Sequence, residues 1–162
     1  MVRMKLVAIL ALTVAMVTTL PAAAEKVGEV GVDWLRSDII VEDIADPKVQ
    51  GVTCHVAYFE RGLVDRLKNG NWFEDPSNSS IACRQTRPIS VGDIDRSEDG
   101  ENVFRQRHSF ILKSVNVRRI YDEANKTLIY LAHARQVKDG AAEMLLSVVP
   151  LYNSGAQWKL KD

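Results

Sequence analysis

The segment VRRIYDEANKTLIYLAHA, residues 117–134, decides the fold class. Two runs of β-branched and aromatic residues flank the polar stretch Asp122–Lys126. Such runs favour strands, and a polar loop of four or five residues joins two antiparallel strands into a hairpin. The second arm is apolar on both faces, which is typical of a strand in the middle of a sheet. The segment therefore predicts a β-hairpin at the centre of a sheet.

The rest of the chain shows the same alternation in short runs separated by turn residues, with little helical periodicity. One stretch differs: RGLVDRLKNGNWF, residues 61–73, fits one or two helical turns ended by Asn69-Gly70. We expect a single, mostly β, antiparallel domain, sandwich-like or a partly closed barrel, with either a short helix or a long loop between the two cysteines. The expected strands, including the two arms of the hairpin, are 27–34, 38–44, 52–59, 80–86, 102–112, 115–122, 127–136 and 145–151.

The first 24 residues have the layout of a secretory signal peptide. Arg3 and Lys5 precede the uncharged apolar run Leu6–Leu20, and three alanines, 22–24, follow it. The run is shorter than the roughly 17–25 residues of a spanning helix. We expect cleavage after Ala24, which leaves 162 − 24 = 138 residues (25–162) as one domain with no later membrane span.

The charge of the expected mature chain is nearly balanced. Removing two of the 21 basic residues leaves 19 against 21 acidic ones, a net charge of about −2. Such a balance supplies no bulk attraction for nucleic acid. We therefore expect no nucleic-acid partner.

The chain contains two cysteines, Cys54 and Cys83. Two cysteines in an exported chain indicate one disulfide, which closes a loop of 83 − 54 = 29 positions and contributes roughly 3–4 kcal/mol. A Cys-x-x-Cys redox pair is absent, and a zinc site needs more ligands at closer spacing. His55 is then the neighbour of Cys54 in a strand and points to the opposite face.

Four segments carry a family resemblance: DPKVQGVTCHVA (46–57), EDPSNSSIACRQTRPI (74–89), VFRQRHSFILKSVNVRRIYD (103–122) and LIYLAHARQV with SVVP (128–137, 147–150). They resemble the CreA family, small exported proteins of Gram-negative bacteria. The resemblance implies a periplasmic location and the same two cysteines, and it implies no activity. One departure is the segment Arg61–Pro76, which is bulky where the family is expected to be rich in glycine.

No pattern of catalytic or metal-binding residues stands out. The three histidines have no metal-ligand spacing, and Gly-x-Ser-x-Gly and phosphate-binding glycine loops are absent. We therefore expect no metal, no cofactor and no catalytic residue. Two functions stay open: a non-enzymatic binding module of the cell envelope, and a periplasmic hydrolase whose acid–base groups converge only in the folded chain.

A basic cluster is the candidate binding site. Arg105 and Arg107 lie two positions apart and so share one face of a strand, and an antiparallel neighbour strand could bring Arg119 beside them. Guanidinium groups bind phosphates and carboxylates. The alternative is a solvated or internally ion-paired sheet face. The partner expected from the sequence is an envelope protein or a small anionic ligand.

Overall fold

The computed structural model describes residues 24–32, 38–60, 79–104, 115–134 and 144–159 of the 162-residue chain. All regular elements in these ranges are strands, so the expected mostly β, antiparallel class is confirmed. The strands are β1 (Glu25–Gly31), β2 (Asp38–Ala45), β3 (Val49–Glu60), β4 (Ser79–Val91), β5 (Glu101–Asn102), β6 (Val115–Asp122), β7 (Thr127–Ala134), β8 (Met144–Pro150) and β9 (Gln157–Trp158).

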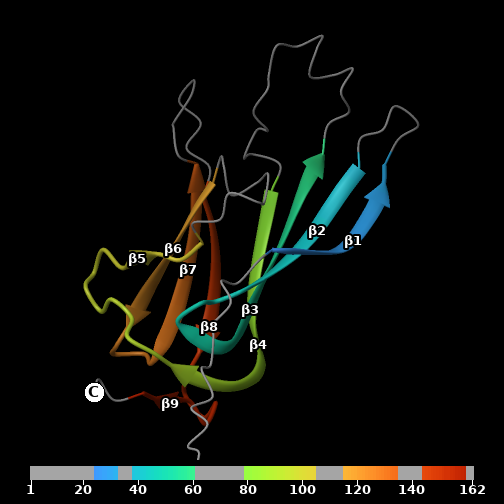
Figure 1. The fold of residues 1–162 in the computed structure, drawn as a ribbon. Helices are drawn as coiled ribbons and strands as arrows, with labels where there is room; N and C mark the ends of the chain where they lie inside the picture. The colour runs from blue at the N-terminus through green and yellow to red at the C-terminus, as the bar shows by residue number, and fades with distance from the viewer. Residues whose placement is uncertain (1–23, 33–37, 61–78, 105–114, 135–143, 160–162) are drawn as a thin grey trace, which may run out of the picture.

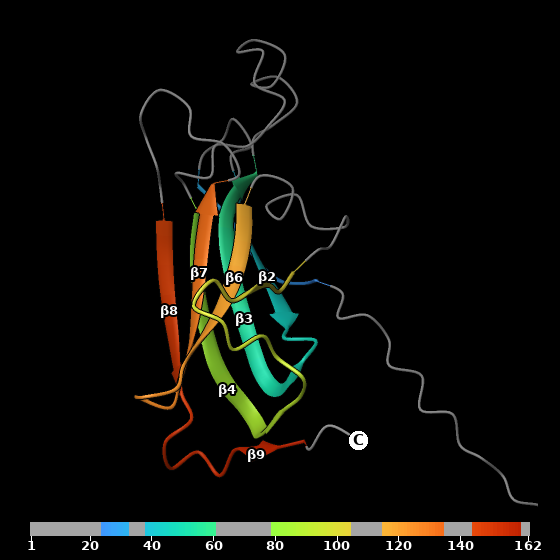
Figure 2. The same ribbon diagram turned by 90° about the vertical axis from the view of Figure 1, so that its left-hand side faces the viewer.

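The strands form two sheets that pack face to face without closing into a barrel (Figures 1 and 2). The first sheet has the order β1-β2-β3-β4-β9 and the second has the order β5-β6-β7-β8. Every pairing is antiparallel except the short β4–β9 pair. The main contact between the sheets joins β4 to β8. Of the two architectures expected, the sandwich-like one is therefore observed.

The hairpin predicted from residues 117–134 is present as β6 and β7. Val117 pairs with Ala132 and Ile120 with Ile129, so the two arms run in continuous register. The turn between them is closed by Asp122, which accepts hydrogen bonds from the backbone and side-chain nitrogens of Asn125 at 3.0 and 2.7 Å. Asparagine and aspartate side chains commonly close turns in this way.

A large bulge interrupts the β3–β4 pairing. Gln50 pairs with Ser90 but Val52 pairs with Gln85, so several residues of β4 oppose one residue of β3. That one residue is Gly51, whose φ is +86° and where a Cβ atom would lie 2.3 Å from the Pro88 carbonyl oxygen. Only glycine fits both the backbone angle and the space.

The core lies between the sheets and follows strand alternation. On β6 the inward positions are Val115, Val117, Arg119 and Tyr121, and the residues between them are only half-buried. Apart from Arg119 these side chains are apolar or aromatic, like those of the inner faces of β3 and β7. One guanidinium thus lies inside a mostly hydrophobic layer.

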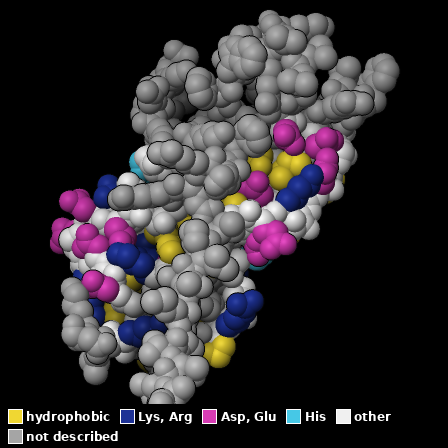
Figure 3. Space-filling model, in the orientation of Figure 1, with side chains coloured by type: hydrophobic (Ala, Val, Ile, Leu, Met, Phe, Trp, Pro, Cys, Tyr) yellow, Lys and Arg dark blue, Asp and Glu magenta, His cyan; other side chains and the backbone are white. Residues whose placement is uncertain are grey.

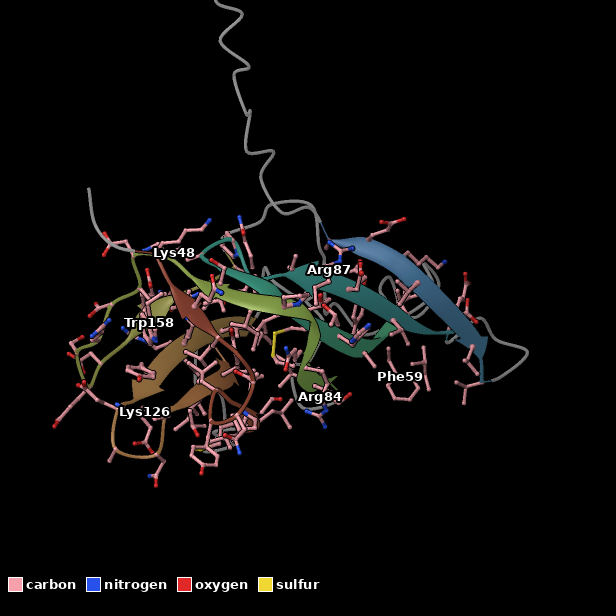
Figure 4. The ribbon with its side chains drawn as sticks, turned by 90° about the horizontal axis from the view of Figure 1, so that it is seen from below. Lys48, Phe59, Arg84, Arg87, Lys126 and Trp158 are labelled. Carbon is pink, nitrogen blue, oxygen red and sulfur yellow. A yellow bond between two sulfur atoms is a disulfide. The ribbon has the colours of Figure 1, made fainter. Side chains whose placement is uncertain are left out.

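One end of the sandwich is covered by β9. Trp158, which is labelled in Figure 4, packs edge-to-face on Tyr121 of β6, with 5.1 Å between ring centroids. The Arg96 guanidinium lies 4.3 Å from the centre of the Trp158 ring. The contact with Tyr121 and the pairing with β4 attach the short last strand to both sheets. The expected strand list omitted β9, because two residues carry no periodicity.

Several expected elements fall partly or wholly outside the described residues. The short helix expected in 61–73 lies there entirely, as does most of the strand expected at 102–112, of which the structure describes β5 and residues 103–104. No helix in the described ranges is long and apolar enough to cross a membrane.

Candidate functional site

The inward-facing Arg119 is the centre of a cluster of charged side chains. Its side chain is 1% exposed, and its Nη1 atom lies 2.5 Å from both carboxylate oxygens of Asp46. Its Nη2 atom donates to Glu101 Oε1 at 2.5 Å. Arg119 is therefore held between two carboxylates from two other segments, the β2–β3 turn and β5.

Asp46 connects the two sheets at this point. Its Oδ1 atom accepts the backbone N–H groups of Lys48 and Val49 at 2.8 and 3.0 Å, which shapes the β2–β3 turn. Its Oδ2 atom accepts the hydroxyl of Tyr130 on β7 at 2.7 Å. One buried carboxylate thus joins a turn of the first sheet to β6 and β7 of the second.

The outer side of the cluster reaches solvent. Glu101 accepts a hydrogen bond from Lys48 Nζ at 2.5 Å and from the backbone N–H of Asp95 at 2.9 Å. The side chains of Lys48 and Glu101 are 46% and 21% exposed. Each charge in the cluster therefore has an opposite charge beside it.

The protonation states follow from these contacts. Burial alone would lower the pKa of Arg119, but the Asp46 carboxylate outweighs burial and the pKa is raised. Burial together with the Asp46 charge raises the pKa of the Tyr130 hydroxyl. Burial alone would raise the pKa of Glu101, but the hydrogen bonds from Lys48 and the Asp95 amide outweigh burial, and the pKa is lowered. Arg119 and Glu101 are therefore charged and Tyr130 is neutral near pH 7.

The predicted three-arginine site divides into two parts. Arg119 faces the core, and its guanidinium hydrogen bonds go to Asp46 and Glu101. Arg105 and Arg107 lie outside the described residues. The inward position of Arg119 could be predicted from strand alternation, because this residue shares a face with Val115, Val117 and Tyr121.

The two cysteines form the predicted disulfide, which is drawn in yellow in Figure 4. Cys54 of β3 and Cys83 of β4 are paired in register and both are fully buried. The backbone N–H of Cys83 donates to Ser147 Oγ of β8 at 2.7 Å, and that hydroxyl lies 3.4 Å from the Cys83 carbonyl. The disulfide is thus tied to the second sheet, a contact that sequence reasoning missed.

Buried polar groups in the described ranges are used for the fold. They are Asp46, Arg119 and Ser147, and each bonds across the two sheets. No group of three histidine, cysteine or acidic side chains in these ranges could hold a metal ion. His55 is exposed and His133 is half-buried. In the described interior, the charged cluster around Arg119 therefore stabilises the fold. The candidate binding sites lie on the surface.

The first surface is the β1 edge of the first sheet. β1 pairs with β2 on one side, and its other side has no strand partner in the described ranges. Val30, Ile39 and Phe59 are paired in register across β1, β2 and β3 and form an apolar row, with Val30 57% and Phe59 36% exposed. Figure 3 shows hydrophobic side chains among acidic and basic ones over this end of the molecule.

The fold and these contacts define a class of protein: a small two-sheet β domain closed by a cross-strand disulfide and a buried ion-pair cluster. The chain belongs to the CreA family, whose profile matches residues 27–154. It is 35% identical over 137 residues to Protein CreA of Escherichia coli strain K12, covering 80% of this chain and 85% of that protein. The same values hold for Protein CreA of E. coli O6:H1 and O157:H7. No solved structure matches the chain significantly.

Proposed function

We propose that this CreA-family protein is a non-enzymatic binding module of the cell envelope, exported to the periplasm by a signal peptide at residues 1–24. Its partner is an envelope protein, and it recognises an extended segment of that partner by adding the segment to β1 as a new strand. The observation that carries the proposal is the unpaired edge of β1 beside the exposed row Val30, Ile39 and Phe59.

The chemistry of the edge supports strand addition. An edge strand presents backbone N–H and C=O groups without partners, and a second chain can satisfy them while its side chains contact the neighbouring face. The apolar row supplies such a contact on one face of the sheet. Backbone pairing supplies affinity, and the apolar row selects among partner segments.

β1 also carries features that oppose indiscriminate pairing. Lys26 and Glu29 form an ion pair along the strand, and the register shifts between Lys26 and Gly28. Charges and bulges on an edge strand hinder edge-to-edge aggregation. An edge so protected is suited to a specific partner.

The hydrolase alternative receives no support from the described interior. Asp46 and Glu101, the two carboxylates of the cluster, both bind Arg119. A general acid or base needs a carboxyl group free to exchange a proton with substrate. These two carboxylates are engaged in holding the sheets together.

The test is photo-cross-linking in the cell. A photoreactive residue at Val30 should give a covalent adduct with an envelope protein, and the same residue at Lys126, in the β6–β7 turn, should not. Fractionation should find both proteins in the periplasmic extract. Adducts from both positions alike, or from neither, would contradict the proposal.

A proline pair shows whether the adduct depends on backbone pairing. The N–H groups of neighbouring strand residues point to opposite sides. Of Glu29→Pro and Val30→Pro, one therefore removes an N–H directed at β2 and lowers the melting temperature. The other removes an N–H directed outward, which an edge strand tolerates. We expect that stable variant to lose the interaction, and an unchanged interaction would contradict strand addition.

A further inference from the structure

The outer face of the second sheet is unusually apolar. The positions of β8 that point away from the core are Met144, Leu146 and Val148, which are 65%, 61% and 42% exposed, together with Pro150. The paired outer positions on β7 include Ile129 and Leu131, and Ile120 continues the face onto β6. We call this surface, formed by Ile120, Ile129, Leu131, Met144, Leu146, Val148 and Pro150, the β6–β8 face.

The size of the β6–β8 face exceeds that of scattered surface hydrophobics. Three strands spaced about 4.8 Å apart, over the seven residues of β8, span roughly 300 Å². The largest contiguous apolar patch on a monomer covers about 300–600 Å² and is often an interaction site. A stable interface covers about 800 Å² per partner, so this face would form its apolar centre.

We propose that the β6–β8 face binds a second copy of this chain in a two-fold symmetric dimer. The observation behind this choice is the order of charges on β6. Arg118 and Asp122 lie one outward position to either side of Ile120, whose register partners are Ile129 and Val148. Consider a two-fold axis that lies in the interface, parallel to this row of three residues. It makes the strands of the second copy run in the opposite direction, and so it places Arg118 of each copy opposite Asp122 of the other.

The same axis matches the apolar residues. Ile120, Ile129 and Val148 meet their own counterparts, and Leu146 meets Pro150 of the second copy. Two aligned sheets pack about 10 Å apart, a distance that arginine and aspartate side chains bridge together. No like charges from the described outer positions oppose one another in this arrangement, as a self-complementary two-fold interface requires.

Arg118 has unused hydrogen-bonding capacity. Its Nη2 atom donates to the Gly100 carbonyl at 3.3 Å, and its Nε atom is buried without an acceptor. No carboxylate in the described ranges lies within ion-pair distance of it. Asp122 accepts hydrogen bonds from Asn125, which lower its pKa and keep it charged at neutral pH. An ion pair between copies would use both groups.

The experiment is sedimentation of the mature, oxidised protein across a concentration series. We expect a monomer–dimer equilibrium that Leu146→Asp weakens at least tenfold, since the charge would be buried against the second copy. Leu146 is exposed, so its replacement should leave the fold intact. Val30→Asp is the matched control: an equally exposed strand valine, on the first sheet, whose replacement should leave the dimer unchanged.

Charge reversal then tests the orientation. Arg118→Asp and Asp122→Arg should each weaken self-association about tenfold, because each variant opposes like charges. Mixing the two variants should restore dimers, since every opposed pair is then of opposite sign. Melting temperatures identify any variant that fails to fold, and the mixing result is read on folded protein only.

Three outcomes would overturn the proposal. A wild-type protein that stays monomeric at every concentration would exclude the dimer. A dimer lost in Val30→Asp but kept in Leu146→Asp would assign self-association to the β1 edge. Binding to neutral phosphatidylcholine vesicles that Leu146→Asp abolishes, with no dimer in solution, would assign the face to a lipid surface. The β1 proposal is separate and stands or falls on its own cross-linking test.

Discussion

Replacing Asp46 with asparagine should destabilise the domain strongly, because it removes one charge from a buried pair. The asparagine side-chain oxygen can still accept the backbone N–H groups of Lys48 and Val49, so the turn keeps its hydrogen bonds. Arg119, at 1% exposure, would lose the carboxylate that binds its Nη1 atom. The variant therefore removes the charge, and with it the acceptor of the Tyr130 hydroxyl, while the turn keeps its hydrogen bonds.

The magnitude follows from the burial. Removing one partner of a buried ion pair costs about 3–5 kcal/mol, whereas an exposed pair contributes about 0–1 kcal/mol. Glu101 still binds the other side of the guanidinium, so we expect a loss near the lower limit, about 3 kcal/mol. Against a net stability of about 5–15 kcal/mol, this corresponds to a fall in melting temperature of about 10 °C.

The assay is urea unfolding of the mature, oxidised protein. Asp95→Asn is the matched control: it makes the same change at an exposed carboxylate that accepts the Ser97 N–H at 2.8 Å, and it should cost less than about 1 kcal/mol. Adding Arg119→Met to Asp46→Asn should recover part of the loss, because the unpaired charge is gone. Equal losses for Asp46→Asn and the control, or a double variant destabilised by the full sum, would refute the reasoning.

Three further predictions concern the disulfide, the acid response and processing. Replacing Cys54 and Cys83 with alanine should lower the melting temperature by about 10 °C, from a loss of about 3 kcal/mol, and free thiols in unreduced native protein would contradict this. The lowered pKa of Glu101 means that its stabilisation is complete above the unfolded pKa of about 4.3 and is lost as the pH falls through the folded value. Thermal unfolding of Glu101→Gln should therefore depend less on pH than wild type between about pH 5 and 3; superimposable profiles would argue against it. Intact-mass analysis of exported protein should find Glu25 at the N-terminus, and a mass that includes Met1 would instead indicate an uncleaved anchor.

Local patterns predicted much of the fold. The hairpin at 117–134 combines strand-forming arms with a turn that its own Asp122 closes, so neighbouring residues contain all the information needed. The disulfide followed from the number of cysteines and the expected compartment, and it is present. In both cases a short-range rule or a simple count agrees with the final structure.

The cluster around Arg119 could be predicted only in part. The alternation of Val115, Val117 and Tyr121 indicates that Arg119 faces the core. Its partner Asp46 is 73 positions away, in a stretch that reads as an ordinary turn. The pairing depends on how two sheets stack, and alternation within one strand does not contain that information. The bulge opposite Gly51 was not predicted for a similar reason, because its shape depends on two strands together.

The division of polar groups between interior and surface is what favours binding over catalysis. Asp46 and Ser147 each form hydrogen bonds to the opposite sheet, so a change at either alters the stability of the domain. Leu146 and Val30 are exposed on outer strands, so a polar replacement there costs little stability. Interior and surface variants should therefore have different effects. Interior variants should lower the melting temperature and leave the partner affinity of the folded fraction unchanged. Surface ones should keep the melting temperature and lose a partner. An interior variant such as Asp46→Asn that stays folded but loses partner binding would show that the buried cluster itself takes part in recognition.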